Sequence, residues 1–242
     1  MMKALKVRDT TFEELIMRRG RPVRWKEASI CSCHHPTSGQ PSYVCQACNG
    51  IGYIYQSSYD GIALVQSLLL HKEHESVGIF ELGDAIMTVP RHYLSLRPDG
   101  KYDKNTQIPN PMFDIGMGDL VTLLDDEYKS SELLIKGESI SGRTPDTLLN
   151  EDITRIKYVY RSNPVTGSII EYKQDEDFRL IGNQIEWIGN QPEDGETYSV
   201  TYYHLPTYIV HVELPRQRHQ DKRDQPKRVV IRYRTVGSYE GE

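Results

Sequence analysis

The chain of 242 residues is 38% hydrophobic and 26% charged, with a formal net charge of −5. This is the composition of an ordinary soluble protein, long enough to bury a hydrophobic core in one or two domains. No apolar run approaches the roughly 20 residues that a membrane-spanning helix needs, which argues against a membrane protein. The polar start of the chain predicts no signal peptide, so we expect a protein that stays in a reducing cytoplasm.

The first predicted element is a short helix. Thr11 and Glu14 have the spacing of a capping box, in which Thr11 caps the helix and Glu14 reaches back to it. The helix continues through Leu15 and Ile16 and should end before Gly20. A helix this short is not stable alone, so we expect it to dock on another part of the chain.

Every cysteine of the protein lies in the next segment, as Cys31-Ser-Cys33 and then Cys45-Gln-Ala-Cys48. Two close pairs separated by a short loop can fold back so that four thiolates meet at tetrahedral geometry, which predicts a structural Zn²⁺ site. Two glycines follow the second pair. Their small size allows a tight turn that leaves backbone amides free to bond the sulfurs.

Other interpretations of these cysteines stay open. His34 and His35 directly follow Cys33, so a site with mixed cysteine and histidine ligands is an alternative. Two disulfides or four free buried thiols are the others. Disulfides need an oxidising compartment and usually serve small, cysteine-dense domains, so the expected compartment favours a metal.

From about Gly61 the pattern is that of β-structure. Short apolar segments separated by Gly-Asp turns suggest a small barrel or sandwich. Asp84 and Asp119 each follow a glycine before an apolar segment, the ordinary position of an acid in a turn. The first segment fits a helix or a strand, because periodicity does not separate the two over so short a run. The segments are 62–70, 78–90 with a bend at Gly83, 113–124, 132–136 and 153–160.

Alternation of apolar and polar residues is clearest between Phe178 and Leu214. Two alternating runs flank Gly182-Asn183, which predicts a hairpin. Strands at 198–202 and 208–214 would complete a four-stranded meander. A further strand at 229–233 lies beyond a basic segment and could pair with a different subunit.

The basic residues gather in a C-terminal arm. Between Pro215 and Arg234 eight Lys or Arg stand against two acids, so this segment carries +6 and the rest of the chain −11. Such an arm binds nucleic acid, binds the acidic face of a neighbouring copy, or is a solvated tail. Without interleaved aromatic residues, a protein partner is favoured over DNA. The candidate contact residues are Arg216, Arg218, Lys222, Arg223, Lys227 and Arg228.

These elements predict a mainly β protein in four parts. Residues 1–60 would form the helix and zinc knuckle, and residues 61–160 a β-barrel-like domain. Residues 161–214 would form the β-meander module, and residues 215–242 the basic arm with its strand. No phosphate-binding loop, nucleophile elbow, H-E-x-x-H or paired-carboxylate motif is found, so we expect no enzyme.

Three features of the sequence combine in a recognisable way. Trp25–Ala28 precedes the cysteines, Gly-Asp strands follow, and the pattern Phe-x-Leu…Ile-x-Trp…Pro-x-x-Gly-x-x-Tyr-x-Val-x-Tyr runs from Phe178 to Tyr202. The combination, over most of residues 20–215, resembles the structural neck proteins of tailed bacteriophages, which connect the capsid portal to the tail. The C-x-x-C-x-G-x-G element is also similar to the zinc repeats of DnaJ-type chaperones, but those have four such elements and a J-domain.

The resemblance implies a non-enzymatic virion protein, located in the neck and assembled in the host cytoplasm. Its members form rings that contact portal or adaptor and tail proteins and help to close the DNA channel, where DNA contact is an added expectation. The zinc knuckle would staple the N-terminal segment. The alternatives are a nucleic-acid-binding protein that uses the zinc knuckle and the basic arm, or a structural protein of the baseplate or tail.

Overall fold

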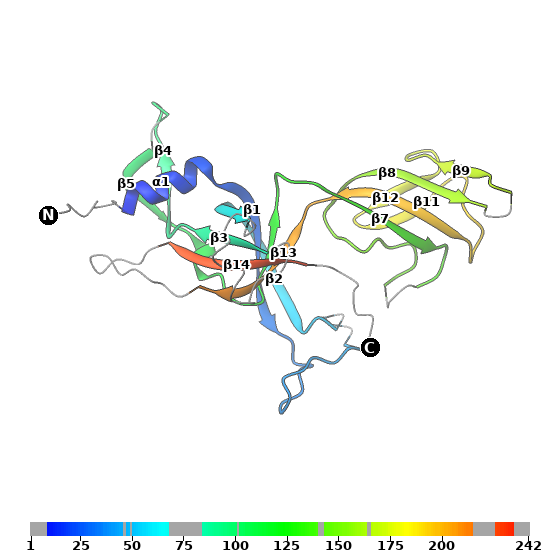
Figure 1. The fold of residues 1–242 in the computed structure, drawn as a ribbon, viewed down its shortest axis with the longest axis horizontal. Coiled ribbons are helices and arrows are strands. Elements are labelled where there is room, and N and C mark those ends of the chain that lie inside the picture. The colour runs from blue at the N-terminus through cyan, green and yellow to red at the C-terminus, as the bar shows by residue number, and fades with distance from the viewer. Residues whose placement is uncertain are drawn as a thin grey trace. The chain divides into compact units, whose positions relative to one another are not determined.

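The computed structural model describes residues 9–45, 47–48, 50–67, 84–100, 102–139, 143–163, 166–214 and 226–234. They form two compact units (Figure 1). The first contains the described residues up to Asp125 together with Thr207–Arg234, and the second contains Asp126–Pro206. In chain order, the elements are α1 (Asp9–Arg19), β1 (Arg21–Ile30), β2 (Tyr53–Ser67), β3 (Ala85–Val89), β4 (His92–Leu96), β5 (Tyr102–Pro109), the 3₁₀ helix η3 (Pro111–Asp114), β6 (Leu120–Leu123), β7 (Tyr128–Ile135), β8 (Ile153–Ser162), β9 (Ile169–Tyr172), β10 (Phe178–Ile181), β11 (Gln184–Trp187), β12 (Thr197–His204), β13 (Thr207–Glu213) and β14 (Lys227–Tyr233).

The first unit is built on a closed barrel with the strand order β1-β2-β3-β14-β13-β6. All six neighbouring pairs are antiparallel. Val23 and Trp25 on β1, and Val121 and Leu123 on β6, point into the core at alternate positions, as the two-residue period of a strand requires. Closure leaves the barrel without a free edge strand.

Helix α1 packs against β2 and β4. Its Ile16 is fully buried, and the buried Glu13 accepts a hydrogen bond from the backbone N–H of His92 at the start of β4 (3.2 Å). The hydroxyl of Tyr102 on β5 donates to the carbonyl oxygen of Met17 (3.2 Å). The short helix is therefore docked on the β4–β5 ribbon, as its length predicts, and Thr11 lies within it rather than at its cap.

The second unit is inserted between two neighbouring strands of the barrel. The chain leaves β6, builds Asp126–Pro206, and returns in β13, which pairs directly with β6 at Thr207 and Thr122. The hydroxyls of these two threonines lie 3.0 Å apart in a hydrogen bond. The chain therefore leaves the barrel and returns to it at adjacent positions of one strand pair.

A four-stranded antiparallel sheet with the order β7-β12-β8-β9 and the β10–β11 hairpin form the second unit. Its core contains Phe178, Tyr198 and Val200, and the ring of Trp187 meets those of Tyr172 and Tyr198 edge to face at 5.1 and 5.3 Å. Edge-to-face contacts of this kind add to the stabilisation that burial of the rings provides.

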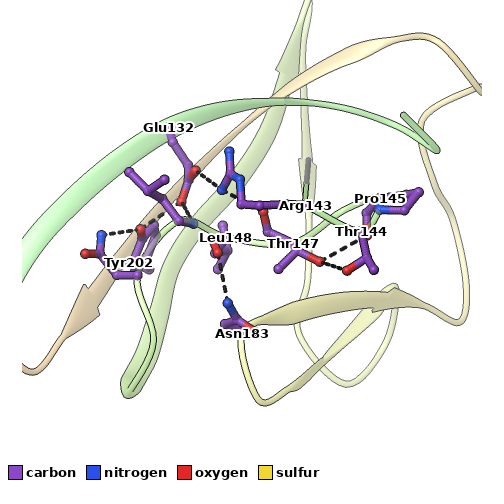
Figure 2. Close-up of polar contacts among 10 residues, drawn as sticks. Glu132, Arg143, Thr144, Pro145, Thr147, Leu148, Asn183 and Tyr202 are labelled. Atoms are coloured by element: carbon purple, nitrogen blue, oxygen red, sulfur yellow. Dashed lines mark hydrogen bonds and ion pairs between the residues drawn. The ribbon is translucent and has the colours of Figure 1, made fainter. Parts of the chain in front are cut away.

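A loop at residues 143–150 is fixed to the sheet by Glu132 of β7 (Figure 2). Its carboxylate accepts hydrogen bonds from the backbone N–H of Leu149 (2.9 Å) and from the hydroxyl of Tyr202 (2.7 Å), and pairs with Arg143 (3.3 Å). The side-chain amide of Asn183 donates to the carbonyl oxygen of Leu148 (3.0 Å), which joins the loop to the β10–β11 turn. These contacts satisfy polar groups that burial would otherwise leave unpaired.

The mainly β class, with a barrel and one short N-terminal helix, is confirmed, but the division of the chain differs from the expected one. The barrel takes strands from both ends of the described chain rather than from residues 61–160 alone. The strands expected in the 178–214 meander exist, and β10 and β11 form the predicted hairpin around Gly182. However, β12 pairs with β7 and β8, and β13 joins the barrel, so these strands do not form a consecutive meander.

Two local expectations need correction. The strand predicted at 113–124 is shorter, because Asn110 caps a 3₁₀ turn by accepting a hydrogen bond from Met112 N–H (3.0 Å), and only Leu120–Leu123 is extended. Residues 62–67 of the ambiguous segment belong to strand β2, and residues 68–70 lie outside the described residues. The bend expected at Gly83, and the part of the 78–90 segment before it, lie outside the described residues.

Candidate metal centre

The cysteines lie at the end of a hairpin formed by β1 and β2. Residues Val23–Lys26 of β1 pair with both β2 and β6, whereas Ala28–Ile30 pair only with Tyr53–Tyr55 of β2. The hairpin therefore continues past the barrel wall, and residues 31–52 connect its two strands (Figure 1).

The four cysteine sulfurs meet in one cluster. Cys31 Sγ lies 3.8 Å from Cys45 Sγ, Cys33 Sγ lies 3.5 Å from Cys48 Sγ, and all four sulfurs are within 4.8 Å of one another. Cys31 and Cys48 are buried, and all four thiols are free. Four thiolates at about 2.3 Å from a central ion would be separated by about 3.8 Å in a tetrahedron, so the cluster could hold a metal ion.

Backbone hydrogen bonds hold the two halves of this knuckle together. The N–H of Cys31 donates to the carbonyl oxygen of Gly52 (2.8 Å), and the N–H of Gly52 donates to Cys48 Sγ (3.3 Å). Gly50 and Gly52 both have positive φ, 77° and 87°, which favours glycine. Gly52 is thus required for the turn and also supplies an amide to a sulfur, as its position after the second cysteine pair predicts.

The two histidines are not part of the cluster that the described residues form, which contains the four cysteines. His34 Nδ1 lies 2.9 Å from the carbonyl oxygen of Cys31, and its ring lies against Gly52 and Tyr53. His35 Nδ1 accepts from the backbone of the exposed 37–38 turn. Both histidines therefore support the shape of the knuckle, and the sulfurs are the atoms placed to bind a metal.

Two of the thiols have shifted pKa values. Loss of solvent around Cys33 raises the pKa of its thiol to about 12, and the neighbouring sulfurs act in the same direction. Backbone hydrogen bonds from Cys48 and Ala47 lower the pKa of Cys45 to about 7. At neutral pH a metal ion would thus meet a partly ionised Cys45 and would displace a proton from Cys33 on binding.

Asp119 fixes the base of the hairpin, a role that its place after a glycine does not reveal. Its buried carboxylate accepts hydrogen bonds from the indole N–H of Trp25, the N–H of Ala28 and the N–H of Gly116, each at 2.8 Å. Ala28 follows the bulge at which β1 leaves β6. The carboxylate therefore does more than the expected turn acid, because besides the N–H of Gly116 in its own turn it accepts from two donors of the distant strand β1.

Asp84 is likewise a buried acid. Its side chain is fully buried and forms two hydrogen bonds with the guanidinium of Arg232 on β14, at 3.0 and 3.1 Å. A signal for this pairing exists only in the tertiary structure, since the partners are 148 residues apart.

The two described candidate contact residues of the basic arm differ in burial. Lys227, at the start of β14, is buried and pairs with Glu213 (3.2 Å), so its charge is compensated within the barrel. Arg228 is exposed on the same strand. Arg216, Arg218, Lys222 and Arg223 lie outside the described residues.

Comparison with protein-family models finds none that matches this chain, and comparison with curated proteins finds no match either. In the described part of the chain, no helix is long and apolar enough to cross a membrane.

Proposed function

We propose that this chain is a structural protein of the neck of a tailed bacteriophage, a ring subunit that joins portal to tail and helps to close the DNA channel. The observation that carries the proposal is the long β1–β2 hairpin, which extends past the barrel and ends in the cysteine knuckle. A subunit of a connector needs a rigid body and elements that reach a neighbour, and the barrel and the hairpin supply both.

We further propose that the knuckle binds Zn²⁺ and that the ion is structural. Four thiolates favour zinc over the hard cations, and a site closed by four protein ligands leaves no position for a substrate. The knuckle has little apolar side-chain area to order it, so the ion would supply the folding free energy of this segment.

The alternative of nucleic-acid binding through the knuckle has less support. From Ala28 to Tyr59 the sequence contains no Asp, Glu, Lys or Arg, and phosphate recognition depends on Lys and Arg. Lys227, a candidate of the basic arm, is already paired with Glu213. Both observations favour a protein partner.

Native mass spectrometry of the purified chain, with and without a chelator, tests both parts. We expect one zinc per chain and a ring or a complex with portal or tail protein, and we expect Cys31→Ser to lose zinc and assembly while the barrel stays folded. Ser32→Ala, at the exposed neighbouring position, is the matched control and should retain both. A metal-free protein would overturn the zinc proposal, and a monomer that binds neither portal nor tail protein would overturn the connector proposal.

A further inference from the structure

The end of the knuckle presents two exposed apolar side chains. Tyr43 and Val44 are 77% and 87% exposed, and they lie on a turn that Cys45 closes by donating its N–H to the carbonyl oxygen of Ser42 (3.1 Å). Gly50 packs so closely on this turn that a Cβ at its position would lie 2.9 Å from the carbonyl oxygen of Tyr43. Tyr43 and Val44 are called here the tip. Their backbone turn is closed and packed before it meets a partner, which reduces the entropy cost of binding.

The tip belongs to a segment of the chain that has no charged side chains. The sequence from Ala28 to Tyr59 has no Asp, Glu, Lys or Arg, although 26% of the whole chain is charged. The centre of a protein–protein interface is depleted in charge and enriched in aromatic residues, whereas an exposed loop with no interface is free to carry charge. The tip thus has the chemistry of an interface centre and calls for an uncharged surface on its partner.

The same chain carries one such surface on the second unit. The strands β7, β12 and β8 bury one face in the core, and their other face carries uncharged side chains in two cross-strand rows. Leu133, Ser199 and Tyr160 form one row by register, and Ser131, Thr201 and Tyr158 form the other.

This set of six residues, called here the open face, includes Leu133 at 63% exposure and Tyr158 at 47%. Charged side chains lie at its border. Lys129 and Arg155 pair with Tyr203 in the next row, and Glu171 of β9 pairs with Tyr160. Lys157 Nζ lies 5.1 Å from the ring centroid of Tyr158. The solvated face of an antiparallel sheet is ordinarily polar, whereas the core face is apolar. An uncharged centre with a charged border is the composition of a binding surface.

We propose that the tip of one copy docks on the open face of a second copy. The tip and the centre of the open face are both uncharged on a chain of net charge −5, so neither surface repels the other. Because the two surfaces differ, the contact is heterologous, and copies joined in this way close into a ring or continue as a filament. The inference rests on the proposed function in that it names the contact between the subunits of the connector.

Sedimentation velocity of the full-length, zinc-loaded chain over a range of concentrations tests the proposal. We expect the wild-type chain to assemble, and we expect Val44→Glu and Leu133→Glu each to weaken self-association by more than about tenfold, since a buried unpaired charge opposes docking. Ile181→Glu, at a 59% exposed position of the second unit outside the open face, is the control and should assemble as the wild type does.

Mixing the two defective variants gives the decisive result. Val44→Glu retains an intact open face and Leu133→Glu retains an intact tip, so together they should form a heterodimer that does not grow further, because the remaining contact would bring two glutamates together. Unchanged zinc content verifies that Val44→Glu keeps a folded knuckle. A monomeric wild type, unaffected assembly of both variants, or a mixture that stays monomeric would overturn the inference.

These outcomes separate the inference from the proposed function. A monomeric chain that binds portal protein would refute docking between copies and leave the connector proposal standing. A chain that assembles through tip and open face but binds neither portal nor tail protein would support docking between copies and refute the connector proposal.

Discussion

Replacing Asp119 with alanine should destabilise the barrel by about 4 kcal/mol. The substitution removes the acceptor of three hydrogen bonds of 2.8 Å, from Trp25 Nε1, Ala28 N and Gly116 N. The bond to Trp25 is buried, so its N–H loses its partner without access to water, at a cost of about 1–3 kcal/mol. The two backbone bonds are partly exposed, and water can replace part of each, which leaves about 0.5–1.5 kcal/mol for each bond.

The two tryptophans of the chain allow this loss to be measured in the correct unit. Trp25 lies in the barrel and Trp187 in the inserted unit, so a Trp187→Phe background leaves Trp25 as the fluorescent reporter of barrel unfolding. Urea titrations of Asp119→Ala and of the control Asp114→Ala, which removes an exposed carboxylate from η3, should differ in midpoint at the same slope. A difference under about 1 kcal/mol would refute the view that Asp119 secures the base of the hairpin.

Two further perturbations follow from buried charges and from pKa. Arg232→Ala should cost about 3 kcal/mol in the same titration, because it leaves the carboxylate of Asp84 buried without its bidentate partner; a loss as small as that of an exposed arginine such as Arg228→Ala would contradict this. Burial lowers the pKa of His204, because the folded protein favours the neutral imidazole. The stability that the neutral ring contributes is fully present above the ordinary pKa of about 6.5 and is lost as the pH falls through the lower pKa of the folded state. Unfolding followed at several pH values should therefore show a decline in acid that His204→Gln reduces, and equal pH profiles for both proteins would rule the histidine out.

Local features of the sequence predicted local structure well. The spacing of the four cysteines was sufficient to predict that their sulfurs meet, because ligands two or three residues apart need only one turn each to converge. The Gly182-Asn183 hairpin followed from turn chemistry, and Gly182 has the positive φ of 63° that such a turn requires. In each case the information lies within a few residues.

The pairing of distant strands could not be predicted in this way. Strand β14 closes the barrel against β3 and β13, and nothing in its own alternation distinguishes a barrel strand from one that pairs with another subunit. Asp84 and Asp119 illustrate the same limit at the level of side chains, since a Gly-Asp pair looks alike whether the acid faces solvent or a guanidinium 148 residues away. Partners at long range are chosen by packing, which a local pattern does not contain.

The adjacency of β6 and β13 leads to a prediction about the independence of the two units. Because Thr122 and Thr207 face each other across the β6–β13 pair, removal of residues 126–206 leaves two chain ends that a Gly-Gly link can join as an ordinary hairpin loop. A short flexible loop costs no more closure entropy than a longer connection at this position, since closure entropy grows with loop length. The shortened chain should therefore keep the barrel and the cysteine cluster. Its free energy of unfolding, followed by Trp25 fluorescence, should stay within about 1 kcal/mol of that of the full chain. Its self-association should be lost, because it lacks the open face. A shortened chain that fails to fold would show that the barrel depends on the inserted unit, and one that still assembles would place the contact between copies elsewhere.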